Sequence, residues 1–418
     1  MFKYMKITNL RDTNKNESVS IEDTIRNSFY IQLKNVKVTG RSIHYPNCLL
    51  ELDGQLLNPY DERVMSLQRD SFYEDNTWDV YTPTSITRKE LTPVFFFIYN
   101  VDNYYHFVYD TLSILYSYFK IKECNPTLKL LLNTSHPTKA EFPQFVTEFL
   151  GQFGITEYLV ASSYTEYETV FVSTSFTHGR HSNEPASMVA YSVWNQLTVN
   201  PQSTPRRFYV SRRSWIHGKT ENIGTNYTTR RKCMNEDAVV ELLKSYDIQE
   251  VFTELLTTEE KLAYFKQAEL VVGVIGGGMC NLLFSPSSTK ALCISTPQFL
   301  EINNRFRYSM DHTDIVYSNC TEHAIKGVMF QPYTRVKIIN PKCTSYGCIG
   351  EVETLIGTDK YIVEVASQTM AGFSQDFPTS SIEFHESELE AMDAGLNSPY
   401  NCNIEQLEVD LKKLLKTE

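Results

Sequence analysis

The sequence has few long apolar runs. The longest, Pro93 to Tyr99, has the length of a strand, and no window of about 18 apolar residues occurs. The polar N-terminus contains neither a continuous apolar segment nor a small-residue cleavage site. These absences predict a soluble, cytoplasmic protein with no transmembrane segment.

Paired cysteines and excess positive charge are also lacking. The nine cysteines are odd in number and scattered, and Cys280 and Cys293 lie in apolar runs. This pattern predicts buried free thiols in a reducing compartment rather than a disulfide framework. The formal net charge is −11. An acidic surface argues against nucleic acid or an anionic membrane as the main partner.

Several motifs that hold nucleotides or metals are missing. The chain has no Asp-x-Asp pair and no Gly-x-Gly-x-x-Gly fingerprint, and no Gly-Lys-Ser/Thr follows its glycine cluster at 276–278. The missing Asp-x-Asp favours neutralising a diphosphate with arginines and helix dipoles, so no metal is expected. A different Rossmann enzyme, such as a nucleotide-dependent oxidoreductase, is an alternative. The missing dinucleotide fingerprint argues against it.

The chain of 418 residues is long enough for two domains. From Val94 onward, strand-sized apolar runs alternate with helical segments of about 10 to 12 residues, which indicates βαβ units and parallel sheets. Residues 200–205 form the best linker. We therefore predict an α/β protein of GT-B type, with two Rossmann-like domains, 1–203 and 204–418, facing a cleft.

Three regions fit this alternation less well. Residues 1–90 predict an irregular, β-rich lead, and Gly350 to Val365 predicts a hairpin. The final helix, 404–416, is expected to pack back on the first domain.

Three consecutive glycines, Gly276, Gly277 and Gly278, follow the apolar strand 270–274. Strands of a parallel sheet bind ligands at their carboxyl ends, and the helix expected from Met279 would point its N-terminus at phosphate. Glycines permit close approach of a ligand and positive φ. The alternative is a tight turn without a ligand.

Arginines follow another strand of the same predicted sheet. The strand 207–211 leads into Ser211, Arg212 and Arg213, and further basic residues return at 230–232. Arginine binds phosphate through a fork of donors. Solvated loop charges are the alternative, but together with the glycines these residues predict a diphosphate pocket.

A third candidate lies on the helix predicted over 104–120. His106 and Asp110 are four residues apart, so they share a helix face with Ser113 and Ser117. Such a pair could remove a proton from a hydroxyl group. We predict Asp110 as the base, with His106 assisting or replacing it. The alternative is a pair that only holds the fold.

These motifs resemble glycosyltransferase family 61, which includes plant β-1,2-xylosyltransferases and animal O-linked N-acetylglucosaminyltransferases. The resemblance spans residues 93 to 300. The matching positions are Asn103, Tyr104, His106, Phe107 and Asp110; Tyr209, Ser211, Arg212 and Arg213; Arg231, Asn235, Glu236 and Asp237; and 275–284. Two positions depart from the family pattern: Ile275 replaces a histidine, and Gly277 replaces an alanine.

The resemblance implies a GT-B enzyme that transfers a sugar with inversion and without a metal. The donor would be a nucleotide sugar, of the UDP-xylose or UDP-N-acetylglucosamine type, and the acceptor a glycan or glycoprotein. The implied donor site comprises Ser211, Arg212, Arg213, Gly276, Gly277, Gly278 and Asn281, with Glu301 on the ribose. The missing anchor points to a bacterial or viral type. Ile275 leaves open a binding or scaffold protein that lost its site.

Overall fold

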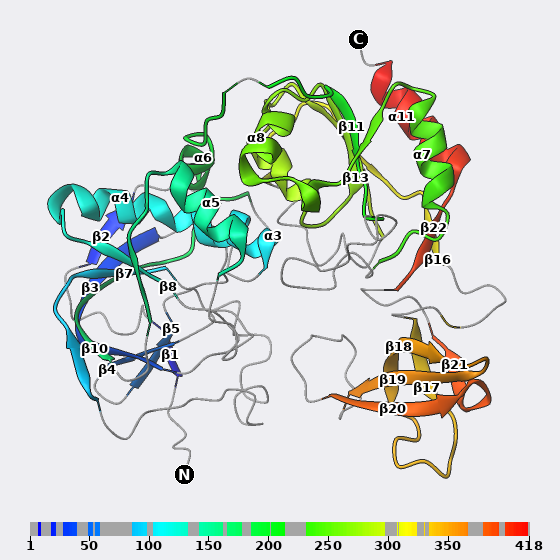
Figure 1. Cartoon of the computed structure of the whole chain (residues 1–418), viewed down its shortest axis with the longest axis horizontal. Helices are drawn as coiled ribbons and strands as arrows, with labels where there is room; N and C mark the ends of the chain where they lie inside the picture. The colour runs from blue at the N-terminus through cyan, green and yellow to red at the C-terminus, as the bar shows by residue number, and fades with distance from the viewer. Residues whose placement is uncertain are drawn as a thin grey trace.

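A computed structural model describes the chain in mixed α/β form, with parallel strands in two sheets (Figure 1). The described residues are 7–9, 18–21, 28–39, 49–52, 55–58, 86–97, 103–132, 142–161, 165–177, 185–200, 202–213, 231–296, 307, 309–323, 330, 334–366, 379–392 and 398–416.

The first sheet contains ten strands in the order β1-β5-β4-β3-β10-β7-β8-β9, with β2 beside β3 and β6 beside β10. Strands β10, β7, β8 and β9 run parallel, whereas β3 is antiparallel to β10. Its strands are β1 (Ile7–Asn9), β2 (Ser18–Ile21), β3 (Ser28–Thr39), β4 (Leu49–Leu52), β5 (Gln55–Asn58), β6 (Arg88–Glu90), β7 (Val94–Phe96), β8 (Lys129–Leu132), β9 (Tyr158–Val160) and β10 (Thr165–Ser173).

The helix predicted over 104–120 is present as one helical run with changing hydrogen-bond spacing. It begins as α3 (Tyr104–His106), continues through a π-helical turn (Phe107–Thr111) and a 3-10 turn (Leu112–Ile114), and ends as α4 (Leu115–Cys124). Asn103 caps it by accepting a hydrogen bond from the His106 amide. Two further helices, α5 (Gln144–Gln152) and α6 (Met188–Trp194), complete this half.

The second sheet is entirely parallel, in the order β12-β11-β13-β14-β15. Its central strand is buried along its whole length, which is why it reads as an unbroken apolar run. The predicted alternation of strands and helices is confirmed here. The elements are β11 (Arg207–Val210), α7 (Glu236–Lys244), β12 (Gln249–Val251), a 3-10 turn (Thr253–Leu255), α8 (Thr258–Lys266), β13 (Leu270–Val274), β14 (Lys290–Ile294) and β15 (Ile315–Ser318).

The closing helix α11 (Ile404–Leu415) lies against this second sheet. Leu407, Leu411 and Leu414 are buried in one cluster with residues of α7, β11, β13 and β14. The expectation that the helix packs back on residues 1–203 is therefore wrong, because its apolar face is covered by its own half. Before it, β22 (Tyr400–Cys402) pairs with β16 (Thr321–His323).

A third sheet, antiparallel throughout, has a core of its own (Figure 1, orange). The predicted hairpin is confirmed: Gly350 of β18 lies opposite Val365 of β19. The hairpin is part of a five-stranded sheet in the order β20-β19-β18-β17-β21. Its elements are β17 (Arg335–Ile338), β18 (Ile349–Ile356), β19 (Lys360–Ala366), β20 (Thr379–His385), a 3-10 turn (Glu386–Glu388) and β21 (Leu389–Ala391).

The two α/β halves share one apolar core. A single cluster of buried residues runs from β3 and β10 of the first sheet to β13 and β14 of the second. Phe149 of α5 contacts Phe284, with ring centroids 5.9 Å apart. Beside them, the Thr258 amide of α8 donates to the Glu148 carboxylate of α5 at 2.8 Å. The halves are thus joined by direct packing at α5 and α8.

No helix within the described ranges is long and apolar enough to span a membrane. Eight cysteines belong to these ranges, and none of them forms a disulfide there.

The packing of α11 predicts unequal effects of truncating two aliphatic side chains on the same helix. Leu411→Ala should lower the free energy of unfolding by about 2–5 kcal/mol, because Leu411 is fully buried. Val409→Ala should change it by no more than about 0.5 kcal/mol, since Val409 is 58% exposed. Urea unfolding of both variants measures the difference. Equal effects would contradict the packing.

Candidate functional site

The three glycines lie at the carboxyl edge of the second sheet, and each faces a different neighbour. A Cβ added to Gly276 would lie 2.9 Å from Nη1 of Arg212, and one on Gly278 would lie 2.7 Å from Cγ1 of Val210. A Cβ on Gly277 would be 3.8 Å from the Tyr104 ring, an ordinary contact. None of the three has a positive φ. Gly278 is therefore required for space and not for backbone conformation, whereas a methyl group on Gly276 would displace the flexible end of the Arg212 side chain.

The segment after the glycines corrects a second expectation. Met279–Phe284 forms a 3-10 turn of six residues, and not the start of an α-helix. Such a short element supplies no substantial helix dipole for a phosphate. Positive charge at this edge must therefore come from side chains.

Two arginines supply that charge. The Arg212 guanidinium lies over Gly276, and Nη2 of Arg231 lies 3.6 Å from the same Cβ position. Arg231 is buried and holds a positive φ of 52°, a conformation that is costly for a residue other than glycine. Two guanidinium groups from separate segments thus converge on the glycine turn, as the sequence suggested for Arg212 and the basic residues near 231.

A buried carboxylate organises the end of β11. Glu236 is 4% exposed, and its Oε1 accepts hydrogen bonds from the Tyr209 hydroxyl, the Ser211 hydroxyl and the Arg212 amide at 2.8, 3.0 and 3.1 Å. Burial raises the pKa of Glu236, and these three donors oppose the rise. The Ser211 hydroxyl, predicted to bind the donor, is therefore hydrogen-bonded to a carboxylate.

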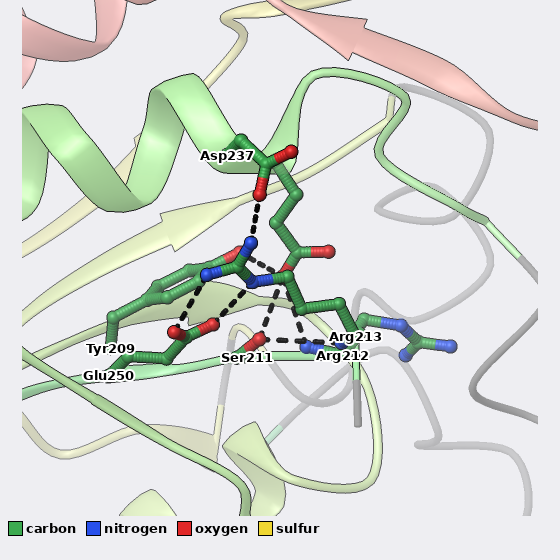
Figure 2. A network of polar contacts seen from close by, with 7 residues as sticks. Tyr209, Ser211, Arg212, Arg213, Asp237 and Glu250 are labelled. Carbon is green, nitrogen blue, oxygen red and sulfur yellow. Dashed lines mark hydrogen bonds and ion pairs between the residues drawn. The ribbon is translucent and has the colours of Figure 1, made fainter. Parts of the chain in front are cut away.

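Arg213 also faces carboxylates (Figure 2). Its Nε and Nη2 donate to the two oxygens of Glu250 at 2.6 and 2.8 Å, and its Nη1 contacts Asp237. Burial alone would raise the pKa of Glu250, but the Arg213 hydrogen bonds and charge hold it below its ordinary value. In Figure 2 the Arg212 side chain points away from this ion pair. The adjacent arginines thus have different surroundings.

The predicted contact between His106 and Asp110 is confirmed. Nδ1 of His106 lies 2.7 Å from Oδ2 of Asp110, and Thr177 donates to Oδ1 of the same carboxylate at 2.6 Å. The Asp110 side chain is 1% exposed, and that of His106 is 19% exposed. The carboxylate therefore lies behind the imidazole, which is the more accessible group. The rest of the polar stripe is also hydrogen-bonded, since Ser113 donates to the Asp110 carbonyl and Ser117 contacts Ser173 of β10.

The first half touches the glycine turn through Tyr104. Its hydroxyl donates to Oδ1 of Asn281 at 2.5 Å, and Nδ2 of Asn281 donates to the Gly278 carbonyl at 2.9 Å. Tyr104 thus anchors the start of the helix that carries His106 next to the glycine turn. Asn281 is fully buried, so it braces the turn.

Ile275 and Glu301 are the two remaining positions that the sequence analysis singled out. Ile275, which stands where the resembling family has histidine, is 1% exposed and packs in the core shared by the two halves. Glu301 lies outside the described residues, as does most of the basic loop after Arg213.

Sequence reasoning gave no role to Glu236, Thr177, Tyr104 or Lys261. Glu236 and Tyr104 lie in motifs that match the family, so the resemblance could have identified them as site residues. Thr177 and Lys261 carry no local pattern, because their contacts depend on segments distant in the chain. Within the described ranges, no group of three or more His, Cys, Asp and Glu side chains could hold a metal ion.

Comparison with known protein families identifies a glycosyltransferase. Residues 104–292 match the family model described as Glycosyltransferase 61, so this part of the chain is a glycosyltransferase 61 domain. The match covers the His106 helix, both arginine positions and the glycine turn, and it confirms the resemblance drawn from the motifs. A family 61 domain makes the chain a transferase. Among curated proteins, none matches the chain.

The Arg213 ion pair predicts a stability effect. Arg213→Ala should lower the free energy of unfolding by roughly 3 kcal/mol, because Glu250 would remain largely buried without its partner; both side chains are 13% exposed. Arg207→Ala, at the other end of β11, should cost no more than about 1 kcal/mol, because its pair with Glu269 is exposed. Chemical denaturation compares the two. Equal losses would refute a special role for the Arg213 pair.

Proposed function

We propose that this glycosyltransferase moves a sugar from a nucleoside diphosphate donor to a hydroxyl group of a glycan or glycoprotein, with inversion and without a metal ion. The donor is of the UDP-xylose or UDP-N-acetylglucosamine type. The single observation that carries the proposal is the convergence of the Arg212 and Arg231 guanidinium groups on Gly276. We assign the two sheets that contain parallel strands to a GT-B arrangement with the donor at this edge.

The diphosphate would lie against the glycine turn. Arg212 and Arg231 would stabilise the negative charge that builds on the departing nucleotide, which is the largest electrostatic demand of the reaction. Ser211, Arg213 and Glu236 would support this site from behind, because their polar groups are engaged with one another and with Glu250. Asn281 would hold the turn in place through Gly278.

The acceptor hydroxyl would lose its proton to His106. The hydroxyl oxygen would then attack the anomeric carbon as the bond from this carbon to the nucleotide breaks. Asp110 would hold the imidazole in orientation and stabilise its positive charge, as buried carboxylates do for catalytic histidines. One base is sufficient for inversion. The burial of Asp110 favours this assignment over Asp110 as the base.

A panel of sugar nucleotides tests the proposal by thermal shift and transfer assays, with and without EDTA. We expect one UDP-sugar to raise the melting temperature and to be consumed in both conditions, with an inverted product by NMR. Gly276→Ala should weaken its binding about 10- to 100-fold, because the added methyl displaces Arg212. Gly277→Ala is the matched control and should change binding less than about 2-fold. A full loss with EDTA would overturn metal independence, and equal effects of the two alanines would overturn the donor site.

Two substitutions test the base. His106→Gln should lower kcat about 10²- to 10⁴-fold with donor binding preserved, because the proton acceptor is lost. Asp110→Asn should retain some transfer, and the acid limb of its kcat profile should move to lower pH, since the imidazolium loses its anionic partner. If Asp110→Asn were inactive while His106→Gln turned over, Asp110 would be the base.

A further inference from the structure

Lys261 is a cationic side chain in the joint between the two halves. It lies in the second turn of α8 and is 5% exposed. Its Nζ is 4.8 Å from the centroid of the Tyr104 ring, which comes from the first half. A cation this close to an aromatic face is attracted by the ring, more strongly when water is excluded.

Carboxylates surround this ammonium at longer range. Glu148 of α5, Glu254 of the preceding 3-10 turn and Glu260 of α8 all act on it electrostatically. Two of them have other hydrogen bonds: Glu148 with the Thr258 amide, and Glu260 with Thr257 in a capping box. Within the described part of the chain, Lys261 forms no ion pair with a carboxylate. Its cation–π contact is with the Tyr104 ring.

Tyr104 is inserted between α8 and the glycine turn. Its ring packs against Phe145 and Phe149 of its own half, with centroids 5.2 and 6.2 Å away. On the other side, the ring approaches Gly277, and the hydroxyl donates to Asn281. The position of this ring thus fixes both the glycine turn and the start of the helix that carries His106.

We propose that Lys261 is a positioning residue: it holds the Tyr104 ring against α8, and thereby sets the base His106 relative to the donor at the glycine turn. The proposal rests on the function proposed above. It assigns Lys261 no direct contact with the sugar or the phosphates. Its effect passes through Tyr104 to Asn281 and His106.

The effect of the buried Lys261 charge on stability distinguishes a positioning role from a purely structural one. Burial lowers the pKa of Lys261 to about 8, although the three glutamates oppose the shift. Between about pH 8 and the ordinary lysine value of about 10.4, the unfolded chain binds more protons at this residue than the folded chain does, so stability rises with pH. At pH 7 the buried charge therefore costs stability. A residue kept only for the fold would not carry this cost.

Lys261→Met keeps the length of the side chain and removes the charge. We expect its melting temperature at pH 7 to equal or exceed that of the wild type, while kcat falls about 10- to 100-fold, since small displacements of reacting groups cost this much. The KM for the donor should change less than about 3-fold. Lys266→Met, at the other end of α8, removes a partly buried lysine away from Tyr104 and is the control, with kcat unchanged.

The pH profile gives a second measurement. Wild-type kcat should decline above about pH 8 as the Lys261 ammonium loses its proton. Tyr104 does not titrate there, because burial raises its pKa well above the ordinary value. Lys261→Arg should retain much of the activity and hold it to higher pH, because arginine stays charged. In Lys261→Met the alkaline decline should be absent.

Hydrogen–deuterium exchange over 270–284 tests the positioning without relying on turnover. Exchange should be faster in Lys261→Met and unchanged in Lys266→Met, because Asn281 and the glycine turn lose their brace. Wild-type exchange and kcat in Lys261→Met would overturn the proposal. A rise in donor KM with kcat preserved would overturn it too, in favour of direct donor contact. A wild type that transfers no sugar would instead refute the proposed function, and the exchange result would still decide on the brace.

Discussion

The site depends on one steric constraint: the carboxyl edge of the second sheet is so crowded at Gly276 and Gly278 that an added methyl group would displace a neighbouring side chain. The arginines, the end of β11 and Tyr104 approach this turn from different sides. Gly278 in particular leaves space that a methyl group would fill, next to Cγ1 of Val210 and Oγ1 of Thr253. The same crowding places positive charge, a strand end and the first half of the molecule around a single short loop.

The carboxylates near the end of β11 give the adjacent residues Arg212 and Arg213 different contacts. Glu250 and Asp237 bind the Arg213 guanidinium. The buried Glu236 accepts a hydrogen bond from the Arg212 amide, and the Arg212 side chain lies near Gly276. The acidic residues are therefore partners of both arginines, and Glu236 also acts electrostatically on Arg212. They hold the strand end in one conformation, so that a positive group can stay near the glycine turn in a protein with a net charge of −11.

Local patterns predicted most of the two α/β halves and the contact between His106 and Asp110. Buried parallel strands read as apolar runs, and the spacing of His106 and Asp110 placed them on one helix face. The roles of Ser211 and Arg213 did not follow from the sequence, because their partners lie 25 and 37 residues away. The same limit applies to Lys261, whose aromatic partner belongs to the other half. The third sheet was predicted only as a hairpin, since β17 and β21 have only four and three residues and β20 begins well after the end of β19, at Thr379.

The antiparallel sheet of residues 335–391 is connected to the second half through two neighbouring strands. Strand β16, just before it, and strand β22, just after it, are hydrogen-bonded neighbours, with Glu322 opposite Asn401. The chain therefore returns to the point that it left, and the parallel sheet is continuous without the excursion. A module exchanged or removed between these two strands would leave the β11–β15 sheet unbroken, so this point of the chain can accept a change of module without altering the sheet that carries the glycine turn.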